Sequence, residues 1–157
     1  MKFNIALRNL LVVLFGALVL SACSTTKKSD LAGDVYTGTE TIEYLAKGVP
    51  DRVFFATNKS SLTTAARDTL RKQATWLRKN KDITVTVEGH ADERGTREYN
   101  LALGERRANA AKDYLMTYGI SGKRISVISY GKEKPVNPAS TPLAWSQNRR
   151  AVSVKAN

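Results

Sequence analysis

Two oppositely charged side chains stand out in this 157-residue sequence, because their positions suggest that they act together. Asp92 follows an alternating apolar segment and opens a charged loop around Gly95, and loops of this kind often carry functional groups. Arg107 lies in an amphipathic segment, where the rotation of about 100° per helical residue brings it beside Leu103 and Ala111. A guanidinium beside an apolar stripe needs a carboxylate or other acceptors, so Asp92 is a candidate neighbour of Arg107.

Two interpretations of this pair follow from the residue types alone. In the first, Asp92 and Arg107 form an ion pair that fixes the loop. In the second, they share a zwitterionic ligand: the aspartate holds its ammonium group, and the planar guanidinium holds its carboxylate. Both interpretations stay open at this point.

Residues with other reactive chemistry are few. The sequence has one Cys and one His, which excludes an intramolecular disulfide and argues against a Cys/His zinc cluster in a single chain. No Ser or Cys nucleophile is matched in the sequence to His90, so a hydrogen-bonding role beside the pocket is favoured over catalysis. We therefore expect no catalytic residue, no metal site and no cofactor.

The elements that must position these residues alternate between strand and helix. The predicted strands span residues 53–55, 83–87, 125–130 and 149–155, and the predicted helices span 63–80 and 98–118, with a helical turn at 143–145. The apolar stripe of the first helix comprises Ala66, Leu70, Gln73, Ala74 and Leu77. The order β-α-β-α-β-(α)-β predicts an α/β fold (an α+β sandwich), with one sheet and helices packed on one face.

The N-terminal segment is typical of an exported lipoprotein. Lys2 and Arg8 precede an apolar run, Leu10 to Leu20, that has the length of a secretory signal and is short for a membrane-spanning helix. The segment Leu20-Ser21-Ala22-Cys23 resembles a bacterial lipobox, which predicts a signal peptide over 1–22 and acyl chains on Cys23. The alternative is a signal anchor with an incidental Cys. Residues 23–50 are predicted to be the lipidated Cys and a flexible tether, and 51–157 the folded domain.

The charge of the chain points to an anionic partner. Lys and Arg together number 25 against 14 Asp and Glu, which gives a formal net charge of +11. Anionic lipid headgroups, carboxylate-rich cell-wall peptides and acidic protein patches all fit this charge. Nucleic acid fits it too, but an exported lipoprotein rarely meets DNA, so we expect no nucleic-acid partner.

Several short motifs occur together in the predicted domain. They are Val53-Phe54-Phe55 with Lys59-Ser60, Gly89-His90-Ala91-Asp92 with Gly95, Tyr99-Asn100, Arg106-Arg107-Ala108, Tyr130-Gly131 with Lys134-Pro135, and Asn148-Arg149-Arg150. In this order and spacing, residues 51–157 resemble the OmpA-like peptidoglycan-binding domain. The resemblance covers about two thirds of the chain and implies one mixed sheet. With the lipobox and tether, the whole chain is similar to lipid-anchored members of that family.

The resemblance also implies roles for individual residues. Asp92 would accept a hydrogen bond from the side-chain ammonium of meso-diaminopimelate in the stem peptide, and Arg107 would donate to its carboxylate. Backbone amides near Asn58 and Lys59 would form an anion nest for the same carboxylate. The two remaining candidates for the ligand-binding set are His90 and Asn100.

The sequence departs from the family pattern at three positions. Thr57 and Asn58 stand where the family often has an aromatic residue and an Asp, which removes a charge near the pocket. The backbone contacts of this loop do not depend on those side chains. Gly104 stands where many relatives have Ser.

The resemblance implies an outer-membrane lipoprotein that faces the periplasm, binds peptidoglycan without covalent chemistry and links the outer membrane to the wall. Ser24 is typical of outer-membrane lipoproteins. The implied partners are peptidoglycan, TolB and TolA, in a system that serves envelope integrity and cell division. The alternatives are a lipid-anchored module that acts mainly through TolB-like partners, a cell-wall enzyme, which one His disfavours, and a flagellar-stator relative, which the lipobox disfavours.

Overall fold

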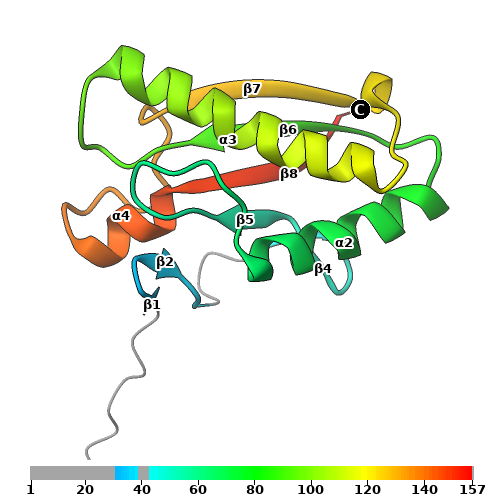
Figure 1. The fold of residues 1–157 in the computed structure, drawn as a ribbon, viewed down its shortest axis with the longest axis horizontal. Coiled ribbons are helices and arrows are strands. Elements are labelled where there is room, and N and C mark those ends of the chain that lie inside the picture. The colour runs from blue at the N-terminus through cyan, green and yellow to red at the C-terminus, as the bar shows by residue number, and fades with distance from the viewer. Residues whose placement is uncertain (1–30, 39–42, 157) are drawn as a thin grey trace, which may run out of the picture.

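The computed structural model describes residues 31–38 and 43–156, and it confirms the predicted order of elements (Figure 1). The elements of the main domain are β5 (Arg52–Phe54), α2 (Thr64–Lys79), β6 (Thr84–His90), α3 (Arg97–Thr117), the short 3-10 helix η1 (Gly122–Arg124), β7 (Ile125–Gly131), α4 (Pro142–Asn148) and β8 (Arg150–Ala156). The helices begin at threonine caps: Thr63, Thr96 and Thr141 each accept a hydrogen bond from the backbone N–H three residues later.

The four strands form one mixed sheet in the order β5-β8-β6-β7. Strands β6 and β7 are parallel, whereas β8 runs antiparallel to both β5 and β6. The carboxyl ends of β5, β6 and β7 therefore lie at the same edge of the sheet as the start of β8. In Figure 1 this is the edge next to α4. The loop that carries Asp92 leaves the sheet there.

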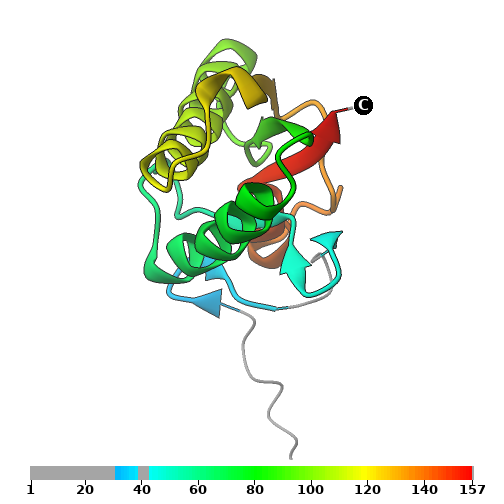
Figure 2. The ribbon, with the colours of Figure 1, turned by 90° about the vertical axis from the view of Figure 1, so that its right-hand side faces the viewer.

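Helices α2 and α3 cover one face of the sheet, as the sequence pattern predicts (Figure 2). The stripe predicted for the first helix is buried at all five positions. In the core, Leu70 and Leu77 of α2 and Leu115 of α3 pack with Val85 and Val87 of β6. Because side chains alternate along a strand, Glu88 and His90 of β6 point to the face without helices.

One close approach fixes α3 on β6. A Cβ atom added to Gly89 would lie 1.8 Å from the carbonyl oxygen of Gly104, and one added to Gly104 would lie 2.8 Å from the carbonyl oxygen of Gly89. The Oγ of Ser129 on β7 is 2.4 Å from that second position. Two glycines are therefore required for the helix to lie this near the strand.

The segment expected to be a flexible tether is folded where the structure describes it. It forms two small hairpins, β1 (Leu31–Ala32) with β2 (Val35–Tyr36) and β3 (Tyr44–Ala46) with β4 (Val49–Pro50). Tyr36 is 2% exposed and its ring packs edge-on against Phe54, with 4.8 Å between the centroids. The sequence pattern did not predict these hairpins, because apolar side chains in two- and three-residue strands show no periodic pattern.

The predicted signal peptide, the lipobox with Cys23 and the first part of the tether lie outside the described residues. Within the described ranges, no helix has both the length and the apolar character to cross a membrane.

Candidate ligand site at the sheet edge

Four segments from distant parts of the sequence meet at the edge where β5 and β6 end. They are the loop after β5, the loop after β6, the junction of α4 with β8, and the hairpin β1–β2. The backbone N–H of Phe55 donates to the carbonyl of Arg149 at 2.9 Å, which joins the first and third segments. The sheet order, rather than any single motif, brings these groups together.

Asp92 lies at the centre of this edge and accepts hydrogen bonds from two arginines. Arg94 donates to the carboxylate through Nε at 3.1 Å and through Nη2 at 2.7 Å, and its backbone N–H adds a third bond at 3.1 Å. Arg149 donates through Nη1 at 3.3 Å. Burial by itself raises the pKa of Asp92, but the bonds from Arg94 outweigh it and hold that pKa below its usual value.

The two arginines differ in how firmly they are held. Arg149 is 3% exposed and also donates through Nε to the carbonyl of Phe55 at 3.0 Å. The side chain of Arg94 is 42% exposed and lies over the ring of Trp145, 4.4 Å from its centroid. Of the two cations on Asp92, Arg94 is therefore the more accessible to solvent.

Arg107 is fully buried and is bonded to carbonyls. Its Nε donates to Lys59 at 2.9 Å, its Nη1 to His90 at 2.8 Å and its Nη2 to Ala56 at 3.1 Å. Its exposed fraction is 0%, and this burial is the main reason why its pKa falls to about 10. The guanidinium thus stays charged at neutral pH and fixes the loop after β5 to the end of β6.

The first interpretation of the Asp92–Arg107 pair is therefore wrong: within the described residues, the ion pairs of Asp92 are with Arg94 and Arg149. The helical pattern placed the guanidinium of Arg107 correctly beside the core, but such a pattern does not reveal which acceptors satisfy it. Backbone carbonyls from two loops fill that role. Three of its five N–H groups are engaged in these bonds, so direct contact of Arg107 with a ligand stays a prediction.

The loop after β5 binds the carboxylate of Asp34 through a backbone amide. This amide lies one residue before Asn58 and Lys59, whose amides are predicted to bind the ligand carboxylate. The backbone N–H of Thr57 donates to Oδ2 of Asp34 at 2.6 Å. This bond is the main reason why the pKa of Asp34 lies below its usual value. Asn58 has a positive φ of 55°, and the N–H of Lys59 closes the turn by donating to Ala56 at 3.1 Å. The side chains of Asn58 and Lys59 are exposed.

Asn100 and His90 do not line the carboxylate positions with their side chains. Asn100 is buried at the start of α3, and its Nδ2 donates to the carbonyl of Arg94 at 2.9 Å, which braces the Asp92 loop. His90 contributes its carbonyl to Arg107, while its imidazole lies on the helix-free face, 3.6 Å from Glu88 and stacked near Tyr130. Burial, followed by Arg150, lowers the pKa of His90 to about 3, so the ring is neutral.

Sequence reasoning missed two contributors to this edge, Asp34 and Arg94. Arg149 belongs to the motif Asn148-Arg149-Arg150 that the sequence analysis singled out, and the structure places it on Asp92. Asp34 gave no signal, because it lies 23 residues from its partner Thr57 in a segment expected to be a tether.

The arrangement can bind two opposite charges side by side. Asp92 accepts from a cation, and the Thr57 amide beside it donates to an anion. No group of three His, Cys, Asp or Glu side chains that could hold a metal ion occurs in the part of the chain that the structure describes.

Known proteins resemble this chain in both sequence and fold. A model of the OmpA family matches residues 54–149. The peptidoglycan-associated lipoprotein of Rhizobium meliloti (strain 1021) is 47% identical over 157 residues, covering 96% of this chain and 89% of that protein. The crystal structure of the peptidoglycan-associated lipoprotein from Burkholderia pseudomallei superposes with a TM-score of 0.66 at 36% identity, covering 68% of this chain and 90% of that one. The cell wall anchor of the T6SS from Pseudomonas aeruginosa gives 0.56 at 28%, covering 68% and 80%.

Proposed function

The chain belongs to the OmpA family, with peptidoglycan-associated lipoproteins as its relatives, and on this premise we propose that it is an outer-membrane lipoprotein that binds the stem peptides of diaminopimelate-type peptidoglycan. The binding is non-covalent and links the outer membrane to the wall. One observation carries the proposal: an acceptor for an ammonium group and a donor for a carboxylate lie side by side at the sheet edge.

The side chain of meso-diaminopimelate is itself a zwitterion, which fits this pair of positions. Its ammonium group would bind Asp92 in place of Arg94, and its carboxylate would bind the amide of Thr57. The buried guanidinium of Arg107 supports the carboxylate position, because it holds the carbonyls of Ala56 and Lys59 on either side of Thr57 and Asn58.

The N-terminal segment gives this site its location in the proposed role. Acyl chains on Cys23 would hold the protein in the outer membrane, and the domain would face the periplasm. Anchoring raises the effective concentration of the domain at the wall, so a modest affinity for a single stem peptide suffices. Within this role, TolB and TolA are the proposed protein partners, in the Tol–Pal system of envelope integrity and cell division.

A pull-down with purified sacculi tests the proposal. The full chain in detergent is mixed with walls that contain diaminopimelate or, in parallel, lysine at the same position of the stem peptide. We expect selective retention on diaminopimelate walls, and Asp92→Asn should lose about tenfold in affinity, since a charged hydrogen bond is removed. Asp113→Asn, which removes an exposed carboxylate on α3, is the matched control.

Circular dichroism must show that both variants are folded. Equal retention on both walls, unchanged in Asp92→Asn, would contradict the proposal. In that case Asp92 is a structural residue and the domain acts through protein partners.

A further inference from the structure

Both charge positions of the site are already filled by groups of this chain. The carboxylate of Asp34 lies on the amide of Thr57 at 2.6 Å. The guanidinium of Arg94 lies on Asp92 at 2.7 Å. The two occupants are neighbours, because Nη2 of Arg94 also reaches Oγ1 of Thr57 at 3.4 Å. Together they present the same pair of charges as the zwitterion that the site is proposed to bind.

Asp34 reaches the site from outside the main domain. It occupies the turn of the hairpin β1–β2, between Ala32 and Val35. Arg149 donates through Nη2 to the backbone carbonyl of Asp34, so the turn contacts a residue that also binds Asp92. Asp34 is exposed, and water and ligands can therefore reach its carboxylate.

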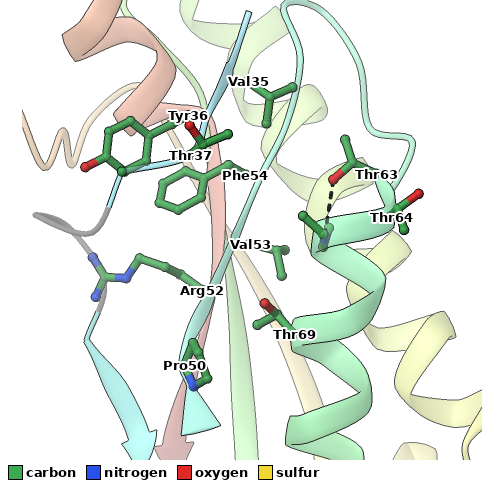
Figure 3. Close-up of a pocket in the computed structure, with 13 residues that line it drawn as sticks. Val35, Tyr36, Thr37, Pro50, Arg52, Val53, Phe54, Thr63, Thr64 and Thr69 are labelled. Atoms are coloured by element: carbon green, nitrogen blue, oxygen red, sulfur yellow. Dashed lines mark hydrogen bonds between the residues drawn. The ribbon is translucent and has the colours of Figure 1, made fainter. Parts of the chain in front are cut away.

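The hairpin is attached to the domain at its turn and at Tyr36, and a pocket lies beneath it. The ring of Tyr36 packs on Phe54, while the space between Val35, Val53 of β5 and Thr69 of α2 is a cavity of about 460 Å³ (Figure 3). Figure 3 shows these side chains around the opening rather than interlocked. The turn is exposed and is held to the domain by the hydrogen bonds of Thr57 and Arg149 to Asp34, so loss of these bonds would let it open locally.

From this geometry we propose that the hairpin β1–β2 is an internal competitor of the ligand: the Asp34 carboxylate occupies the position of the ligand carboxylate, and the peptide binds by displacing it. The inference rests on the proposed function and concerns the regulation of the same site. The apparent affinity for the wall is then lower than the intrinsic affinity, in proportion to the fraction of molecules whose hairpin is undocked.

Binding of a tripeptide that contains meso-diaminopimelate, measured by calorimetry on the full chain in detergent, tests this competition. Asp34→Asn keeps the size of the side chain but removes its charge, so the variant should bind about three- to tenfold more tightly than the wild type. Tyr36→Ala, which releases the hairpin at its other attachment, should change the affinity in the same direction. Asp113→Asn makes the same change in charge on α3 and should bind like the wild type.

Hydrogen exchange at the Thr57 amide supplies a second readout that needs no ligand. In the free protein this amide should exchange faster in Asp34→Asn than in the wild type, because its acceptor is weakened. Equal affinity of wild type and Asp34→Asn, or weaker binding by the variant, would overturn the competition. If no protein binds the tripeptide, the proposed function fails together with the competition, and the exchange rates still show whether Asp34 holds the amide.

Discussion

The two ends of the sheet are each organised by an arginine that binds carbonyls, but of the two it is the near end, where β5 and β6 end, that carries the candidate ligand site. At the far end, where β6 begins, Arg124 donates to the carbonyls of Leu77, Asn80 and Ile83 at 2.6 to 3.1 Å and closes the turn between α2 and β6. At the near end, Arg107 does the same for the loop after β5.

The two arginines, Arg124 as the far clamp and Arg107 as the near clamp, differ in what surrounds them. Arg124 donates to backbone carbonyls, so its hydrogen bonds complete a turn. The near end adds the carboxylate of Asp92, two more arginines and an amide that holds a carboxylate. An arginine therefore stabilises a loop at either end, and the charged groups around the loop at the near end form the candidate ligand site.

The largest effect should come from the glycine that lets α3 lie on β6 at the near end. Gly89→Ala puts a methyl group 1.8 Å from a backbone carbonyl, so we expect a loss of about 3 kcal/mol or more in the free energy of unfolding. Urea denaturation measures it. At the far end, the matched Gly122→Ala meets only the flexible side chain of Met116 and should cost less than about 1 kcal/mol. Equal losses of stability in Gly89→Ala and Gly122→Ala would contradict the difference in packing between the two ends of the sheet.

Removal of the near clamp, Arg107, should have the second-largest effect on the free energy of unfolding. Arg107→Ala removes three hydrogen bonds to backbone carbonyls, one of them fully buried, and leaves a cavity beside Phe55, so it should lower the free energy of unfolding by about 3 kcal/mol. Ligand binding should fall as well, because the loop with Thr57 loses its support. Arg106→Ala, an exposed position on the same helix, is the control and should behave like the wild type.

Removal of the far clamp sharpens the comparison. Arg124 is only half-buried, so Arg124→Ala should lower the free energy of unfolding by about 1–2 kcal/mol. Binding to diaminopimelate walls should be unchanged in the folded variant. A loss of binding comparable to that of Arg107→Ala would show that the two ends are not separate in function.

The smallest expected effect is an acid sensitivity confined to the near end. The pKa of Asp92 is lower in the folded chain than in the unfolded one, so its contribution to stability is complete above pH 4 or so and is lost as the pH falls through its folded value. Asp92→Asn should remove about 1 kcal/mol of this pH dependence in urea titrations between pH 5 and pH 2. An unchanged profile would mean that its arginine pairs contribute nothing to stability.

The sequence predicted the elements of the domain well, and the reason is visible in α2. Its apolar stripe is long enough to define a face, so five buried positions could be assigned without a structure. The position of Asp92 at a strand end could be predicted equally well, because the alternation of apolar and polar residues ends just before it. The OmpA-family resemblance then supplied the mixed sheet, which periodicity alone does not determine.

The partners of the site residues could not be predicted from the sequence, for two physical reasons. The acceptors of Arg107 are backbone carbonyls, and every residue has one, so residue types gave no signal for Lys59, Ala56 and His90. The contact of Asp34 with Thr57 depends on a hairpin with two-residue strands, which is below the length at which a pattern is detectable. The orientation of the His90 imidazole could have been predicted from strand alternation. Val85 and Val87 point to the core, so His90 points to the opposite face of the sheet.

The position of the hairpin has a consequence for how the protein responds to tension. The chain ahead of Leu31 leads into β1, so a pull from that side loads the hairpin before it loads the four-stranded sheet. On this path, the turn that carries Asp34 is held by the hydrogen bonds that Thr57 and Arg149 donate to it. If tension breaks these bonds first, the proposed internal competitor leaves the site, and binding to the wall would strengthen under load rather than weaken.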